Sequence, residues 1–244
     1  MGDDNKKRTV ALLGPFVFCQ NQKRLDPKIS GKTGELLAFL IANEGRYLQR
    51  DTLVSEIWGG RNWARGKSSL NTALWRIRKI SFFQDFFTLD SCETSLNLKT
   101  NPAIEVDIHL LEKAIRKASL QNGFGHDLLS KDINGQLRSA VDKYFGPFLE
   151  PYSSNWVLVE RERHLNFYIR ALLTLIHDAA ERRDFEEALE FGMKILAEDP
   201  FRESTQREVM WLYVLNGQRA AAILHYRHFR ELILSELEIE PLSE

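Results

Sequence analysis

The segment from Arg65 to Lys79 combines an apolar stripe with a polar face that carries hydroxyl groups and cations but no acid. Leu70, Leu74 and Ile77 recur at the i, i+4, i+7 spacing that is typical of a buried helix face. On the opposite face of such a helix lie Ser68, Ser69, Thr72, Trp75, Arg76 and Lys79. Hydroxyls and long cations are the groups that bind base edges and phosphates in a DNA major groove. A solvated surface helix would show the same pattern, so the neighbouring segments must decide between the two interpretations.

Two further helices are predicted before this segment. Ser30 can cap a helix whose apolar positions fall within residues 36–41. A shorter helix starts at Asp51 or Thr52 and ends at Gly59-Gly60. The segment from Arg65 to Lys79 is therefore the third helix in a row.

Strand patterns flank the three predicted helices. Residues 10–19 form an apolar, strand-like run that Gly14-Pro15 interrupts. Residues 86–89 and 95–98 are two short strand patterns joined by a turn over residues 90–94, which predicts a β-hairpin. Strands, three helices and a hairpin make a winged helix-turn-helix, in which the third helix reads DNA and the hairpin is the wing.

The first hundred residues resemble the OmpR-type winged-helix domain. The residues that carry the resemblance are Leu12-Leu13-Gly14-Pro15-Phe16, Leu36-Leu37-Ala38-Phe39-Leu40, Leu53-Val54-Ser55-Glu56-Ile57-Trp58 and Leu74-Trp75-Arg76-Ile77-Arg78. The resemblance implies that the reader helix enters the major groove and that the wing meets the DNA backbone or minor groove. The wing turn departs from this expectation, because Ser91-Cys92-Glu93-Thr94 holds an acid and no Lys or Arg.

Composition narrows the class of protein. The hydrophobic content of 43% is ordinary for a globular chain, and no apolar run is long enough to span a bilayer. The sequence Met1-Gly2-Asp3-Asp4 is not a signal peptide. Cys19 and Cys92 are too few for a disulfide framework or a zinc site, which favours a reduced, cytoplasmic location. We expect no cofactor, no metal and no membrane contact.

The two halves of the chain differ in charge. Residues 1–100 carry 16 Lys and Arg against 10 Asp and Glu, a net charge of +6. The rest of the chain carries 17 against 24, a net charge of −7. This asymmetry is typical of a basic nucleic-acid-binding domain joined to an acidic partner domain.

The boundary between the domains is predicted near Asn101-Pro102, which breaks regular structure. We therefore expect a winged-helix DNA-binding domain over residues 1–102 and an all-α domain over residues 103–244. Asp107 is a candidate N-cap for the first helix of the second domain. The expected fold is mainly α with small β-sheets.

The last third of the chain contains a repeat. Ala188 and Ala222 occupy matching places and are 34 residues apart, which is the period of tetratricopeptide repeats. Pro200 ends the first unit, and the last helix is expected to run to about Leu237. The second domain is therefore predicted to be tetratricopeptide-like, with an ordinary helical bundle as the alternative.

A second resemblance extends from about Asp107 to the end of the chain. Its residues are Phe148-Leu149-Glu150, Trp156-Val157-Leu158-Val159-Glu160-Arg161-Glu162-Arg163, Asp199-Pro200-Phe201-Arg202-Glu203 and Leu237-Glu238-Ile239-Glu240-Pro241. They resemble the bacterial transcriptional activation domain that follows an OmpR-type winged helix in the Streptomyces antibiotic regulatory protein family. Glu238 departs from the pattern, because the family usually has Gly there. The resemblance implies an activator that binds promoter direct repeats as head-to-tail copies and recruits RNA polymerase.

Several motifs that suggest enzymes or metal sites do not hold. Gly31-Lys32-Thr33 imitates the end of a P-loop, but Asp26 stands where that motif needs Gly. His225 and His228 have no further ligand at metal-binding spacing. No catalytic Ser, His and acid pattern is present, so we do not expect an enzyme.

The candidate DNA contacts divide by position. Ser69, Thr72 and Arg76 lie on successive turns and are the base-edge candidates, and Arg76 can pair bidentately with guanine. Trp75 is expected to pack on sugar or on a thymine methyl group. The remaining candidates are expected to meet phosphate: Lys32, Arg65, Lys67, Ser68, Arg78 and Lys79. For Arg78 a structural ion pair, and for Trp75 packing against the wing, are alternatives.

Residues 59–65 link the second and third helices. In OmpR-type proteins this loop contacts polymerase or DNA. Arg61 and Trp63 are therefore candidates for polymerase contact, and the alternative for Trp63 is packing on the reader helix.

A DNA-binding transcriptional regulator is the favoured function. The alternative is a helical adaptor whose winged domain binds protein, and the +6 charge argues against it.

Overall fold

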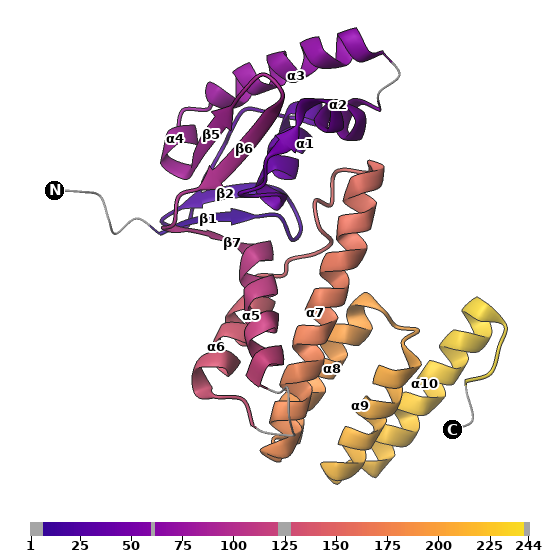
Figure 1. Ribbon diagram of the computed structural model, residues 1–244. Coiled ribbons are helices and arrows are strands. Elements are labelled where there is room, and N and C mark those ends of the chain that lie inside the picture. The colour runs from indigo at the N-terminus through magenta and orange to yellow at the C-terminus, as the bar shows by residue number, and fades with distance from the viewer. Residues whose placement is uncertain (1–6, 60–61, 122–127, 242–244) are drawn as a thin grey trace. The chain divides into compact units, whose positions relative to one another are not determined.

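The computed structural model describes residues 7–59, 62–121 and 128–241 (Figure 1). Its elements in chain order are β1 Arg8–Ala11, β2 Val17–Gln20, β3 Lys23–Leu25, α1 Gly31–Ala42, β4 Leu48–Gln49, α2 Arg50–Trp58, α3 Trp63–Arg78, α4 Phe83–Phe86, β5 Phe87–Ser91, β6 Ser95–Thr100, β7 Ile104–Val106, α5 Asp107–Gln121, α6 Lys131–Val141, α7 Asn155–Glu181, α8 Phe185–Glu198, α9 Glu203–Leu215 and α10 Arg219–Leu237. The predicted fold class, mainly α with small sheets before an all-α region, is confirmed.

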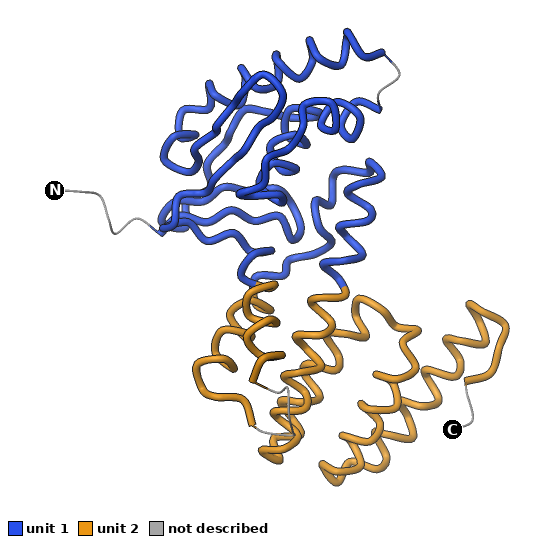
Figure 2. Tube along the Cα trace, viewed as in Figure 1, with its two compact units in different colours: residues 1–110, 143–165 blue, residues 111–142, 166–244 orange. Residues whose placement is uncertain are grey.

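The chain divides into two compact units, and each unit is built from two separate stretches (Figure 2). Residues 1–110 and 143–165 form the first unit, and residues 111–142 and 166–244 form the second. The sequence patterns gave no sign that residues 143–165 return to the first unit.

The first unit contains two small sheets. One has the strand order β3-β2-β1-β7 and the other has the order β4-β6-β5. The predicted break at Gly14-Pro15 is confirmed, since β1 and β2 pair antiparallel on either side of it and Gly14 has a φ of +107°. The predicted hairpin is also confirmed: β5 pairs antiparallel with β6 from Phe87–Thr100 to Ser91–Leu96. The strands β3, β4 and β7 and the short helix α4 were not predicted.

Three helices form the helix-turn-helix part of this unit, with α3 at one edge and β1, β2 and β7 at the opposite edge (Figure 1). The helix α2 begins at Arg50, one residue before the predicted start, and ends at Gly59 in the left-handed conformation. The helix α3 begins two residues before the predicted start because the Asn62 side chain caps it, accepting from the Arg65 backbone N–H at 3.1 Å. Ser30 is the N-cap residue of α1, but its side chain makes no capping hydrogen bond.

A buried carboxylate on α1 ties the returning stretch to this unit. Glu35 is only 3% exposed and accepts hydrogen bonds from Trp156 Nε1 at 2.9 Å and from the Ser154 hydroxyl. The Trp156 ring packs edge-on against Phe39, with the ring centroids 4.8 Å apart. The core of the winged unit therefore includes side chains from residues 143–165.

The carboxylate of Asp107 joins the start of α5 to the segment after β1. It accepts from the backbone N–H groups of Leu12, Leu13 and Ile108 at 2.7, 2.8 and 2.8 Å. Asp107 was predicted as an N-cap, and in the structure it is the first residue of α5. Burial raises the pKa of its carboxyl to about 6, although the three N–H donors act in the opposite direction.

An ionic network connects three helices of the second unit. Arg138 on α6 pairs with Glu187 on α8. Arg182, which follows α7, donates to Glu187 at 2.6 Å and to Asp178 at 3.1 Å. Asp178 also accepts a hydrogen bond from the Leu129 backbone N–H at 2.8 Å. Its buried negative charge is therefore compensated by an ion pair and by hydrogen bonds.

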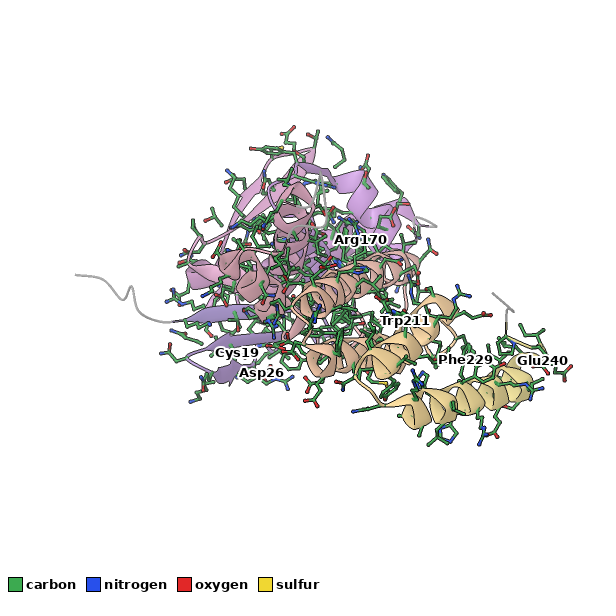
Figure 3. All side chains as sticks on the ribbon, turned by 90° about the horizontal axis from the view of Figure 1, so that it is seen from below. Cys19, Asp26, Arg170, Trp211, Phe229 and Glu240 are labelled. Carbon is green, nitrogen blue, oxygen red and sulfur yellow. The ribbon has the colours of Figure 1, made fainter. Side chains whose placement is uncertain are left out.

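The helices α8, α9 and α10 carry the predicted repeat. Ala188 and Ala222 are both buried, at 0% and 8% exposure, as small residues between paired helices should be. The close approach of α8 and α9 depends on Gly192, because a Cβ there would lie 2.6 Å from Val209 Cγ2. The helix α10 ends at Leu237, as predicted. Figure 3 labels Trp211 on α9, which is 62% exposed, and Phe229 on α10, which is buried.

Candidate nucleic-acid interface

The reader helix α3 is fixed by its apolar stripe and by one glycine. Leu70, Leu74 and Ile77 are all buried, as the sequence predicts. Gly66 faces α2 so closely that a Cβ at this position would collide with Val54 Cγ1. The absence of a side chain at Gly66 therefore lets α3 pack tightly on α2 with its other face outward.

The outward face of α3 presents the predicted contact residues. Ser68, Thr72, Arg76 and Lys79 are exposed, and Ser69 is half-buried. Thr72 donates its hydroxyl proton to the Ser68 carbonyl at 3.0 Å, so its oxygen is left as an acceptor. Two of the three base-edge candidates, Thr72 and Arg76, are therefore exposed to solvent.

A hollow of about 430 Å³ lies along this face, and we call it the reader hollow. It brings together six of the ten predicted DNA-binding residues, which come from α1 and α3. Its lining residues are Ser30, Lys32, Thr33, Trp58, Arg65, Ser68, Ser69, Thr72, Ala73 and Arg76. No acid belongs to this lining, so its electrostatic character is positive.

Some of the cations predicted to contact DNA already form an ion pair with a carboxylate of this protein, and others do not. Lys32 pairs with the buried Glu35 at 2.8 Å, and Lys67 pairs with the exposed Asp51 at 3.6 Å. Within residues 62–121, which include all of α3, the side chains of Arg65, Arg76, Arg78 and Lys79 form no ion pair with any described acid. The structural ion pair considered for Arg78 is therefore absent from the described part of the chain.

Two tryptophans on α3 each lie beside a lysine one turn later. Trp75 is 61% exposed, and Lys79 Nζ lies 5.9 Å from its ring centroid. Trp63 is 39% exposed, and Lys67 Nζ lies 5.6 Å from its ring centroid. Both rings are open to a partner. Arg61, the other candidate for polymerase contact, lies outside the described residues.

Arg50 connects the wing to the reader helix, and the sequence patterns did not single it out. Its guanidinium donates to the Cys92 carbonyl at 3.1 Å, to the Ser91 hydroxyl at 2.9 Å and to the Asn71 side chain at 3.0 Å. Its backbone N–H donates to the Thr94 carbonyl at 2.8 Å. These partners are more than 20 residues away in sequence, so no local pattern could have indicated the contact.

The tip of the wing carries an acid, Glu93, and an exposed thiol, Cys92. Glu93 is exposed at this turn. Cys92 Sγ lies 3.0 Å from the Ser95 hydroxyl, and this hydrogen bond is the main reason why the pKa of the thiol is lowered to about 7. A carboxylate at the tip repels phosphate, so the wing is a poor candidate for insertion into the minor groove.

The described residues offer neither a metal-binding cluster nor a membrane-spanning helix. There, no three His, Cys, Asp or Glu side chains gather as a metal ion would require. Over the same residues, no helix is both long enough and apolar enough to cross a bilayer.

Comparison with known proteins places the chain in a family. Residues 106–244 match the bacterial transcriptional activator domain. The regulatory protein AfsR of Streptomyces coelicolor is 23% identical over 206 residues, which cover 84% of this chain and 20% of AfsR. The chain therefore spans about one fifth of the length of that curated relative.

A solved structure shares the fold. EmbR of Mycobacterium tuberculosis, in complex with a low-affinity phosphopeptide, superposes with a TM-score of 0.74 at 16% sequence identity. The superposition covers 98% of this chain and 63% of that chain. The resemblance to the Streptomyces antibiotic regulatory proteins is confirmed by these matches. Since the domain match covers more than half of the chain, the protein belongs to the bacterial transcriptional activator domain family.

Proposed function

We propose that this protein binds promoter DNA sequence-specifically through α3 and activates transcription from the bound site. The observation that carries the proposal is the acid-free lining of the reader hollow, together with the exposed cations of α3 that no described carboxylate holds. A DNA strand is a polyanion, so it gains most from cations that are not already neutralised.

The positions on α3 support a division of roles. Ser69, Thr72 and Arg76 would contact base edges, because they share one face and point away from the buried stripe. Lys79, Arg78 and the other flanking residues would contact phosphate or sugar: Lys32, Arg65, Lys67, Ser68 and Trp75. Lys32 would do so while it remains paired with Glu35.

The activation step is assigned to the rest of the chain. We infer that DNA binding belongs to residues 1–102, where the charge is positive, and activation to the acidic residues 103–244. RNA polymerase would be met through the loop that runs into α3, whose first residue, Trp63, is partly exposed. Two copies bound head-to-tail on a direct repeat would present this loop in the same direction.

The test is the salt dependence of duplex binding by the full chain. With roughly four to six phosphate contacts, the logarithm of the binding constant should fall against the logarithm of salt concentration with a slope of about −4 to −5. Arg227→Ala, a charge removal on α10, is the control and should leave the slope unchanged. A flat salt dependence would instead favour the protein-binding adaptor.

The head-to-tail arrangement has a test of its own. A footprint on the promoter should cover two half-sites in the same orientation, with their centres about one helical turn apart. Protection of an inverted repeat would contradict the arrangement and leave the DNA-binding proposal standing.

A further inference from the structure

A second hollow lies next to the reader hollow and is lined partly by residues outside the predicted contact set. It has a volume of about 320 Å³ and is bounded by the loop between β3 and α1 and by the C-terminal part of α3. Its lining residues are Pro27, Lys28, Ile29, Ser30, Thr33, Trp75, Arg76, Lys79 and Ile80. Every charged residue in this lining is a cation. We call it the loop hollow.

The loop that carries Lys28 has a fixed backbone. The Asp26 carboxylate accepts a hydrogen bond from the Lys28 backbone N–H at 2.8 Å. Lys28 itself has a φ of +52°, a left-handed conformation that is uncommon for a residue with a side chain. Its side chain forms no ion pair within the described part of the protein. The fold therefore places in the lining a lysine whose side chain pairs with no described carboxylate.

The loop hollow continues the surface of the reader hollow. Ser30, Thr33 and Arg76 line both of them. When α3 lies in a major groove, the sugar-phosphate strand at the edge of that groove runs along the side of the helix. A strand that follows this continuous surface passes from the reader hollow to the loop hollow.

A third hollow, on the wing side of α3, has a lining of mixed charge. Its lining includes Asp51 and Glu93 together with Arg50 and Lys67. Carboxylates there offset the cations, whereas the loop hollow offers Lys28, Arg76 and Lys79 with no acid. A phosphate is therefore expected to prefer the side of α3 that faces the loop.

We propose that the loop hollow binds a DNA phosphodiester, with Lys28 and Lys79 as charge partners and the Ser30 hydroxyl as a hydrogen-bond donor. This inference rests on the proposed DNA-binding function and adds, in Lys28, an anchor that lies outside the three helices of the helix-turn-helix. Lysine contacts phosphate as a point charge and does not read sequence, so the anchor strengthens binding to every duplex by the same factor.

The experiment measures binding of the full chain to cognate and to random duplex DNA at several salt concentrations. Lys28→Gln should weaken both complexes by about 3-fold and make the salt slope shallower by about 0.9. Lys28→Gly should do the same while it also relieves the left-handed backbone, so a loss of affinity in both variants cannot come from unfolding. Lys23→Gln, on β3 and outside the lining, is the matched control and should behave as the unaltered chain does.

The results of this experiment can contradict the phosphate anchor at Lys28 without contradicting the proposed DNA-binding function. If the unaltered chain binds duplex DNA and Lys28→Gln leaves affinity and slope unchanged, the anchor is wrong and the DNA-binding function stands. A loss confined to one base pair of the cognate site would make Lys28 a base reader instead. Binding of inorganic phosphate that is lost in Lys28→Gln, together with unchanged duplex affinity and salt slope in that variant, would assign the hollow to free phosphate. If the unaltered chain binds no duplex, both proposals fail.

Discussion

The indole Nε1 of Trp156 donates a hydrogen bond to the Glu35 carboxylate at 2.9 Å, although the two residues are 121 positions apart in sequence. Lys32 and Ser154 contact the same carboxylate. Glu35 is therefore shared between α1 and the returning stretch, and the stability of the winged unit should depend on both.

Replacing Trp156 by Phe tests this dependence. The change leaves a buried carboxylate oxygen without one of its donors and should lower the free energy of unfolding by about 1–3 kcal/mol. Urea denaturation of the full chain measures the loss. Trp211→Phe is the control, because Trp211 is 62% exposed and its replacement should change stability by less than about 0.5 kcal/mol. Equal stabilities of the two variants would show that the Glu35 contact is unimportant.

Arg76 and Lys79 should differ in what they do on DNA. Arg76→Ala should weaken binding to the cognate site by about 1–3 kcal/mol and relax the preference at one base pair. Lys79→Ala should weaken cognate and random duplex alike, because a phosphate contact carries no sequence information. Competition binding against single-base variants of the site measures both effects. The assignment fails if Arg76→Ala lowers cognate and random binding by the same factor.

Arg50 should control the mobility of the wing. Arg50→Met removes the side-chain contacts to Ser91, Cys92 and Asn71 but keeps the backbone hydrogen bond to Thr94. Amide hydrogen exchange over residues 91–95 should become faster, since the turn loses its attachment to α3. Asn71→Ala removes only one of the contacts and should have a smaller effect. Unchanged exchange in Arg50→Met would contradict this role.

The second unit should lose stability in acid through Glu187. Its hydrogen bond to Arg138 is the main reason why the pKa of its carboxyl is lowered to about 2, and Arg182 contributes as well. The folded pKa lies below the ordinary value of 4.5, so the stabilisation is complete above about pH 4.5 and is lost as the pH falls toward 2. Urea unfolding between pH 7 and pH 2 should show this decline, and Glu187→Gln should flatten it. A decline of equal size in the variant would assign the acid sensitivity to other carboxyls.

The end of α10 should become more stable when Glu238 is replaced by Gly. Glu238 is the C-cap residue, with φ of +57° and ψ of 29°, a left-handed conformation that glycine adopts without strain. Glu238→Gly should raise the free energy of unfolding by about 1 kcal/mol. Glu236→Gly, inside the helix, should lower it by about 1 kcal/mol. The family pattern, which usually has Gly at this position, agrees with the observed backbone.

Elements with a strong local pattern were predictable from the sequence. The stripe of Leu70, Leu74 and Ile77 is buried as predicted, and the hairpin forms around the predicted turn. The strands β4 and β7 have two and three residues, too few for a period-2 alternation to be recognised. Such short strands form because a neighbouring strand supplies their hydrogen bonds, which only the folded structure reveals.

The candidate interface was predictable where it lies on one helix and not where distant segments meet. The exposed face of α3 follows from its helical period. The loop hollow requires Lys28 and Lys79 to line the same cavity, and the wing attachment requires Arg50 to reach Ser91. These are tertiary contacts across 40 or more residues, and no spacing rule connects such positions.

The first unit is built from two stretches of the chain, so the order in which the ribosome makes them determines when this unit can fold completely. Translation delivers the reader helix early, whereas Trp156 leaves the ribosome only after residues 111–142, which belong to the other unit. A nascent chain that already carries α3 therefore still lacks the part of the first unit's core that packs against α1. The first unit can therefore be completed only in chains whose translation has continued past residue 165, inside α7, the helix with which the second stretch of the other unit begins.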